Sequence, residues 1–282
     1  MKLNLGSYSG SGDPLTEFTN ALLISNASPN TVRAYERAVR EFLEFTGKDP
    51  KSVTPVDVMR WANSLLSHAQ KLDPITRKKR LKTVRLYLVA IKKFLKWMGV
   101  DAKVPVPKTR SDDLQVLTEA QIEKLRELPR SLKYKTIVNL MLDTGLRANE
   151  VLSINVEDVN WESNSIVVKN TKNGEFRVVF FTSRTKELLQ RYMKKYNVTQ
   201  GRLFNVSYQA LYREIKRLGR KLGIDLRPHL LRHTFATVAI KRGMPLPAVQ
   251  RLLGHKDIRT TQIYLHLASE DLRKAYEAYF EA

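Results

Sequence analysis

The chain has 282 residues, of which 43% are hydrophobic, so it is long enough for two domains with separate cores. Lys and Arg number 49 against 28 Asp and Glu, and the net charge of +21 indicates a polyanionic partner. The chain has no cysteine, which excludes disulfides, thiolate zinc sites and cysteine nucleophiles.

Membrane attachment is the rival explanation for the excess of positive charge. No apolar run is long enough to cross a bilayer, and the N-terminus lacks the pattern of a secretory signal. We therefore expect a soluble, cytoplasmic protein without membrane contact, and nucleic acid becomes the leading candidate for the polyanion.

Three helices are expected in the first hundred residues, after a loose Gly- and Ser-rich arm at residues 1–12. Ser28 is a typical helix cap, and the apolar residues after it recur at helical spacing. A second helix follows Thr54, and a longer one spans residues 75–98 with its own apolar stripe. The two stripes consist of Val32, Tyr35, Val39 and Phe42, and of Val84, Tyr87, Ile91, Phe94 and Met98.

The longest of these helices is strongly basic. Residues 71–96 contain ten Lys or Arg side chains and one acidic residue, Asp73. A solvated surface would mix the two signs, so we favour contact with DNA phosphates over a plain surface face. The side chains assigned to this contact are Lys78, Lys79, Lys82 and Arg85.

Residues 100–113 predict an extended linker, because two closely spaced prolines are followed by a run of charged residues. The linker would separate a helical domain at residues 13–99 from a second domain at residues 114–282.

The second domain is expected to begin with a helix capped by Thr118. A further helix at residues 134–142 ends at Gly145, and a short helix then holds Glu150. Two β-branched runs flank the dipeptide Asn173-Gly174, which favours a tight hairpin turn. This hairpin is the clearest strand signal in the chain.

The helix after Ser207 has two opposite faces. One face is apolar, and the other carries the polar residues Gln209, Arg213, Lys216 and Arg220. Such a helix fits the major groove of DNA, with Gln209, Arg213 and Lys216 as the contacts, although a plain surface helix has the same pattern.

The stretch RPHLLRHTFAT, residues 227–237, places His229 and Arg232 one turn apart near the start of a core helix that Pro228 begins. Burying cationic groups is costly unless an anion or a polar network compensates them. From these residues alone, a phosphate site is as open as the two plainer explanations, a satisfied structural network and a solvated edge, since helix N-termini attract phosphate.

Four segments follow one another between residues 144 and 266: TGLRANE, KNTKNGE, HLLRH and LGHKDIRTTQIYLH. Together they resemble the signature of the tyrosine recombinases, or phage integrases. The lack of large insertions is similar to the Xer recombinases, including their archaeal members. The resemblance implies a mainly α fold: an N-terminal SAM-like helical DNA-binding domain at 13–99, and at 114–282 a helical catalytic domain with a small antiparallel β-sheet.

The resemblance also assigns roles around a scissile phosphate. Arg147 and Arg232 would neutralise its charge, because guanidinium groups are permanently charged, bidentate donors. His229 and His255 would donate to the nonbridging oxygens, and His229 could also take the proton of the nucleophile. Tyr264 would be that nucleophile, and its hydroxyl, with an ordinary pKa of about 10, needs a cationic pocket to become reactive.

Four further residues receive supporting roles. The resemblance implies that Lys172, beside the hairpin turn, would be the general acid for the leaving 5′-oxygen, and Lys169 is the alternative. Glu150 is expected to orient the Arg147 guanidinium. His233 is interpreted either as a core histidine or as a residue that packs behind the site without contacting the phosphate.

The implied function is site-specific cleavage and rejoining of duplex DNA through a 3′-phosphotyrosyl intermediate, with resolution of chromosome dimers at a dif-like site as the cellular task. The sequence shows no P-loop and no acidic metal cluster, so no cofactor or metal is expected. The expected partners are double-stranded DNA and further copies of the chain in a tetramer on DNA. The need for a paralogous recombinase stays open.

Residues 269–282 predict an amphipathic helix, which would dock on a neighbouring protomer or, more simply, pack on its own domain. Two other functions remain as alternatives: a type IB-like topoisomerase or nicking enzyme working as a monomer, and a noncatalytic DNA-binding protein. The complete set of six catalytic residue types argues against a noncatalytic protein. The docking helix argues against a topoisomerase that works as a monomer.

Overall fold

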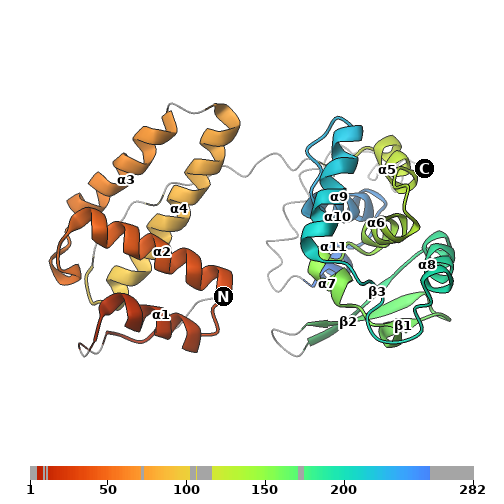
Figure 1. The fold of residues 1–282 in the computed structure, drawn as a ribbon, viewed down its shortest axis with the longest axis horizontal. Coiled ribbons are helices and arrows are strands. Elements are labelled where there is room, and N and C mark those ends of the chain that lie inside the picture. Colours follow the sequence, from red (N-terminus) through yellow and green to blue (C-terminus); the bar gives the residue numbers. More distant parts are fainter. Residues whose placement is uncertain are drawn as a thin grey trace, which may run out of the picture. The chain divides into compact units, whose positions relative to one another are not determined.

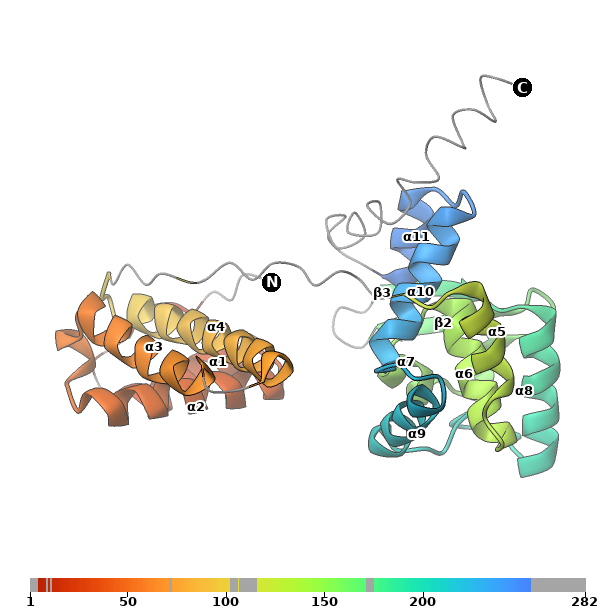
Figure 2. The same cartoon turned by 90° about the horizontal axis from the view of Figure 1, so that it is seen from above.

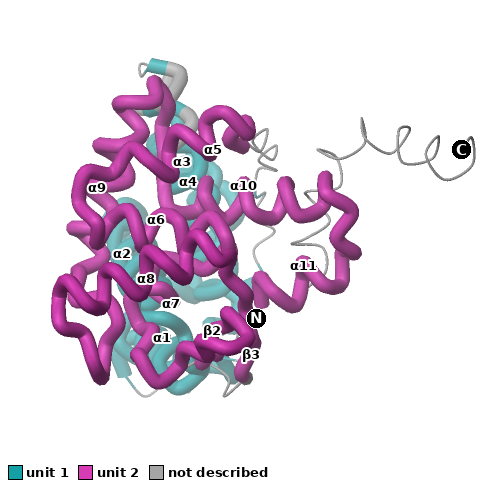
Figure 3. Tube along the Cα trace, turned by 90° about the vertical axis from the view of Figure 1, so that its right-hand side faces the viewer, with its two compact units in different colours: residues 1–111 teal, residues 112–282 magenta. Residues whose placement is uncertain are grey.

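The computed structural model describes residues 5–8, 10, 12–70, 73–101, 106, 116–170 and 175–254. The chain divides into two units, Met1–Ser111 and Asp112–Ala282 (Figure 3). Both units are mainly helical, and the second contains a small antiparallel sheet. The predicted fold class is therefore confirmed.

The first unit consists of α1 (Pro14–Ile24), α2 (Pro29–Thr46), a short 3-10 helix (Pro50–Ser52), α3 (Pro55–Gln70) and α4 (Pro74–Trp97) (Figure 1). Each helix begins with proline, whose missing N–H would have no partner in the first turn. The predicted cap is confirmed at α2, where the Ser28 side chain accepts a hydrogen bond from the backbone N–H of Thr31. The helices predicted after Thr54 and over residues 75–98 are confirmed as α3 and α4.

The core of the first unit lies where α4 packs against α2 and α3. Both predicted apolar stripes are buried along their whole length. Aromatic rings fill the centre: Phe42 lies 5.2 Å from Trp61, and Phe18 lies 5.3 Å from Phe94, both edge to face. Packing of this kind fixes which face of α4 points outward.

The second unit surrounds α6 (Leu132–Thr144), which packs beside α5 (Glu119–Glu127), α8 (Ser183–Tyr196) and α10 (Pro228–Lys241) (Figure 2). Shorter helices α7 (Ala148–Ser153) and α11 (Leu246–Leu253), the 3-10 helix Val156–Asp158 and α9 (Tyr208–Lys221) complete it. The predicted capping box at Thr118 and the stop of α6 at Gly145 are confirmed. Helices α8 and α11 were not predicted.

The sheet has the order β1 (Val159–Asn160), β2 (Ser165–Asn170) and β3 (Glu175–Phe180), with antiparallel pairing throughout. The predicted pair of strands is confirmed as β2 and β3, in which Val168 lies opposite Arg177. Because side chains alternate along a strand, Arg177 shares the inner face with the buried Val179.

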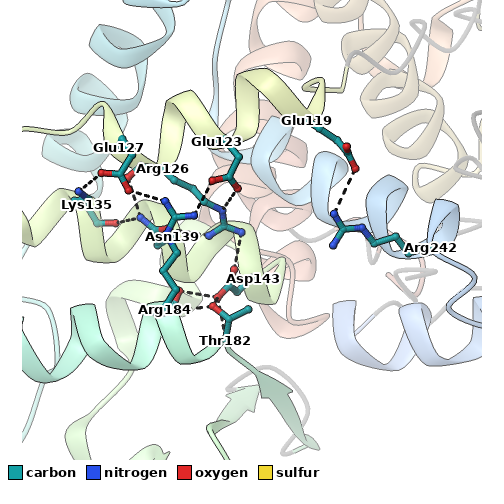
Figure 4. Close-up of polar contacts among 11 residues, drawn as sticks. Glu119, Glu123, Arg126, Glu127, Lys135, Asn139, Asp143, Thr182, Arg184 and Arg242 are labelled. Carbon is teal, nitrogen blue, oxygen red and sulfur yellow. Dashed lines mark hydrogen bonds and ion pairs between the residues drawn. The ribbon is translucent and has the colours of Figure 1, made fainter.

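A buried carboxylate joins the helices that surround α6. The Asp143 side chain, 2% exposed, accepts hydrogen bonds from Arg126 of α5 at 2.7 Å and from the Thr182 and Thr185 hydroxyls at the start of α8, both at 2.7 Å (Figure 4). Charge-assisted bonds of this kind satisfy a carboxylate that burial would otherwise destabilise. The network holds the C-terminal end of α6, from which the candidate site begins.

Several predicted features lie outside the described residues: most of the linker 100–113, the Asn173-Gly174 turn and the terminal helix 269–282. In the part of the chain that is described, no helix combines the length and the apolar character needed to span a membrane.

Candidate active site

The turn from α6 to α7 places Arg147. Helix α6 stops at Gly145, which has a φ of 63° in the left-handed region. A Cβ at this position would lie 2.3 Å from a ring carbon of Phe235 on α10, so only glycine allows this approach. Arg147 follows as the N-cap residue of α7, with its side chain 41% exposed.

Glu150 gathers three arginines around one carboxylate. Its Oε1 accepts a hydrogen bond from Nη1 of Arg147 at 2.9 Å, and its Oε2 accepts one from the backbone N–H of Arg147 at 2.8 Å. The same Oε2 accepts from Nη2 of Arg177 at 2.8 Å and lies 4.0 Å from Nη1 of Arg232. The expected contact between Glu150 and Arg147 is therefore present.

Glu150 is ionised in this setting. Burial alone would raise its pKa, but the hydrogen bonds from Arg177 and from the Arg147 backbone, together with the charges of both, lower it below the ordinary value. One negative charge thus faces three permanent positive charges. The surplus favours a bound anion.

Arg232 is buried, at 3% exposure, on α10. Its Nη1 donates to the carbonyl of Gly145 at 2.9 Å, and its Nη2 donates to the carbonyl of Leu253 at 2.6 Å. The side chain therefore joins the end of α6 to the end of α11, two places where helix carbonyls lack intrahelical partners. A structural network therefore holds this guanidinium, and the role of Arg232 at a phosphate stays a prediction.

His229 lies at the start of α10 and is exposed, whereas His233, one turn later, is half-buried. Partial burial lowers the pKa of His229, and the charges of Arg232 and Arg147 lower it further. Burial, followed by the charges of His229 and Arg232, also lowers the pKa of His233. Both imidazoles are therefore neutral at pH 7, and His229 can act as a proton acceptor.

The lowered pKa values of His229 and His233 predict that the protein loses stability in mild acid. Their folded pKa values lie below the ordinary value of 6.5, so below that pH the unfolded chain binds more protons than the folded chain. Their contribution is complete above about pH 6.5 and is lost as the pH falls through the folded pKa values. Thermal unfolding between pH 7.5 and 5 should show a smaller drop in Tm for His233→Gln than for the intact chain. An equal drop would contradict the prediction.

The structure brings Arg147 and Arg232 together around Glu150, and His229 lies close enough to both arginines for their charges to lower its pKa. Lys172, His255 and Tyr264 lie outside the described residues. Arg177 was not predicted as part of the cluster. Strand alternation could have found it, since it places this arginine on the buried face of β3. Among the described residues, no group of three acidic or histidine side chains could hold a metal ion.

The residues predicted to contact DNA lie on α4 and α9. Lys82 and Arg85 are exposed on α4, and Gln209 and Arg213 are exposed on α9. Lys216 instead donates to Asp225. Lys78 and Lys79 lie on the same helix as Lys82, but their side chains are outside the described part of the structure.

The second of two mainly helical units thus holds three arginines around one carboxylate. Comparison with known proteins identifies which enzymes share this fold. Residues 115–271 match the phage integrase family, and residues 15–99 match the phage integrase N-terminal SAM-like domain. The chain belongs to the phage integrase family and is a site-specific tyrosine recombinase of the archaeal Xer type.

Three relatives illustrate the similarity. Tyrosine recombinase XerA of Saccharolobus solfataricus is 51% identical over 280 residues, which cover 98% of this chain and 96% of that protein. The crystal structure of a XerA recombinase has a TM-score of 0.53 and 28% identity, over 95% of this chain and 99% of that chain. The structure of the XerH recombinase bound to a palindromic difH substrate has a TM-score of 0.70 and 20% identity, and the match covers 94% of this chain and 84% of that chain.

Proposed function

We propose that this chain cleaves and rejoins duplex DNA at a specific site through a 3′-phosphotyrosyl intermediate. The observation that carries the proposal is the gathering of Arg147, Arg177 and Arg232 around Glu150, which leaves a surplus of positive charge. The exposed His229 lies close enough for the charges of Arg147 and Arg232 to lower its pKa. A cluster fixed before the substrate arrives stabilises the charge that develops on a phosphate in the transition state.

In the proposed reaction, the Tyr264 hydroxyl oxygen attacks the scissile phosphorus and loses its proton to His229. The bond from phosphorus to the 5′-oxygen breaks, and that oxygen takes a proton from Lys172. Attack by a 5′-hydroxyl on the phosphotyrosine then reverses both transfers and rejoins the strand. The covalent bond conserves the energy of the phosphodiester, so ATP is not required.

Lys172 is proposed as the general acid over Lys169. The Lys169 ammonium lies 2.6 Å from the nearly buried carboxylate of Asp158. The hydrogen bond to Asp158, followed by its charge, raises the pKa of Lys169. An ammonium held in an ion pair with a raised pKa is a poorer proton donor at neutral pH, and this supports Lys172.

The proposal is tested by incubating the intact chain with a nicked duplex library, in which departure of a short strand traps the adduct. Sequencing the DNA that remains on the denatured protein should recover one enriched sequence. The adduct should also form in EDTA. Cleavage that leaves no adduct and needs added Mg²⁺ would favour a metal-dependent nuclease, in which water is the nucleophile. Adducts spread evenly over all sequences would favour a topoisomerase.

Double-stranded DNA as the partner is supported by the net charge of +21 and by the exposed basic residues of α4 and α9. The XerH relative was solved bound to its difH substrate. By analogy, we infer that the target here is a dif-like site and that the cellular task is resolution of chromosome dimers.

The two basic helices should contribute differently to binding. Neutralising Lys78, Lys79 and Lys82 to Gln is expected to weaken binding to every duplex alike and to reduce the salt slope by roughly 1 per lost phosphate contact. Changing Gln209 and Arg213 to Ala should instead alter which sequence is preferred. Titrations against specific and random duplexes at several salt concentrations measure both effects. The division fails if both sets reduce specific and random binding equally.

The working assembly is proposed to be a tetramer on two duplexes, in which residues 269–282 of one copy dock on the next. These residues carry an apolar stripe of Leu272, Tyr276, Tyr279 and Phe280. An apolar stripe of this size is stabilised by a partner surface.

Removal of residues 269–282 should therefore abolish full-site complexes and reduce cleavage, while the binding of one copy to a half-site persists. Native gels with half-site and full-site DNA measure both. A large loss of thermal stability together with loss of half-site binding would show that the segment packs on its own domain.

A further inference from the structure

We propose that Arg177 is a positioning residue of the phosphate-binding cluster, which acts through Glu150 to fix the Arg147 guanidinium. The role rests on the proposed function, because it concerns the same cluster. Arg177 would hold the catalytic residues in place and would not itself touch the substrate.

The contacts of Arg177 point into the protein. Its side chain is 12% exposed on the inner face of β3. Its Nη2 donates to Glu150 at 2.8 Å, and its Nε donates to the carbonyl of Leu252 at 2.9 Å. A guanidinium anchored through two of its nitrogens in this way supports its neighbours and is poorly placed to reach a phosphate at the surface.

The carboxylate of Glu150 is held from two sides. Arg147 binds it through its backbone N–H and through Nη1, and Arg177 binds Oε2 from β3. Arg232 lies 4.0 Å from the same oxygen and would attract the carboxylate if Arg177 were lost. Without Arg177, Glu150 is then free to turn toward Arg232, and the orientation of Arg147 is no longer fixed.

The end of α11 depends on the same arginine. The last carbonyls of α11 have no partner within the helix. Arg177 donates to the carbonyl of Leu252, and Arg232 donates to the carbonyl of Leu253. Gly254 follows with a φ of 65°, and a Cβ there would lie 3.0 Å from Nη1 of Arg177. Arg177 thus packs against the glycine that ends α11, and the two arginines fix this helix end next to Glu150.

The test compares Arg177→Lys with the matched control Arg184→Lys in the full chain. Arg184 also forms two ion pairs, with Glu123 and Glu127 (Figure 4), but lies on α8, which contributes no residue to the cluster around Glu150. Lysine keeps the charge and loses the planar fork that bridges two acceptors. For both variants, half-site affinity, Tm and the single-turnover rate of adduct formation are measured on two nicked duplexes. One carries an ordinary scissile phosphate and the other a neutral methylphosphonate.

Arg177→Lys should slow adduct formation on the ordinary phosphate by about 10- to 100-fold with unchanged half-site affinity, as expected for a displaced catalytic group. On the methylphosphonate, the difference from the intact chain should largely vanish, since the charge that Arg147 would neutralise is absent. Arg184→Lys should match the intact chain on both duplexes. An unchanged rate for Arg177→Lys on the ordinary phosphate overturns the proposal, as does an equal slowing on both duplexes, which indicates a general structural role.

A second measurement needs no cleavage. The charge of Arg147 lowers the pKa of His229, so displacement of Arg147 in Arg177→Lys should raise that pKa in an NMR titration, and Arg184→Lys should leave it unchanged. If the intact chain forms no adduct, the proposed function fails, and the His229 titration alone decides the role of Arg177. An unchanged His229 pKa in Arg177→Lys then overturns it.

Discussion

Replacement of Tyr264 by Phe is expected to abolish the covalent protein–DNA adduct on a nicked duplex while leaving the affinity for that duplex unchanged. The substitution removes one oxygen, which is the atom proposed to attack phosphorus. The Arg147 and Arg232 guanidinium groups stay in place to bind the phosphate. Loss of a nucleophile removes the covalent pathway altogether, so the adduct yield should fall by at least about 10³-fold.

The measurement is a denaturing gel of protein and labelled DNA after a fixed incubation, beside a native gel for affinity. Tyr196→Phe is the matched control, because Tyr196 is a tyrosine, 44% exposed, at the end of α8. The control should form the adduct at the yield of the intact chain. Persistence of the adduct in Tyr264→Phe would assign the nucleophile to another residue.

Several elements of the fold could be predicted because their signals are local. Ser28 and Thr118 cap helices with their own side chains, and Gly145 ends α6 in a conformation that glycine favours. The long apolar stripe of α4 specifies both the helix and its buried face. None of these features needs a residue distant in the chain.

Helices α8 and α11 escaped prediction for physical reasons. α8 is rich in charge, and its buried face consists of few residues, among them Leu188, Leu189 and Tyr192. α11 has only eight residues, a length at which an isolated helix is unstable in water. The carbonyl of Leu252, near its end, is bound by Arg177, which lies 75 residues away in the chain. Such a helix depends on tertiary contacts that no local pattern reports.

The same distinction applies to the candidate site. Arg147, His229 and Arg232 were found from residue types in order along the chain, which is a pattern of sequence. Arg147 and Arg232 both lie next to Glu150, whose partner Arg177 is 27 residues away in the chain and meets it only in the folded unit. The residues proposed to react can thus be named from the sequence. Strand alternation indicates only that Arg177 is buried, and its contact with Glu150 is seen in the structure.

Arg232→Lys is expected to reduce both stability and cleavage, and the cleavage loss should exceed what the stability loss explains. The Arg232 guanidinium is 3% exposed and bridges the carbonyls of Gly145 and Leu253. A lysine ammonium lacks the planar fork that reaches both carbonyls, and one unsatisfied buried carbonyl costs about 1–3 kcal/mol. Loss of a preorganised donor for the phosphate should slow adduct formation by at least about 10²-fold.

Arg126→Lys separates the two effects. Arg126 is similarly buried, at 13% exposure, and binds Asp143 and Asn139 in the network that holds α5 to α6; it is not one of the three arginines around Glu150. Arg126→Lys should lower Tm by about as much as Arg232→Lys, because both variants lose a forked, charge-assisted contact. Adduct formation per folded molecule, measured well below both Tm values, should stay at the level of the intact chain for Arg126→Lys and collapse for Arg232→Lys. If the two variants lose cleavage only in proportion to unfolding, Arg232 has a structural role alone, and the phosphate must be held by other groups of the cluster.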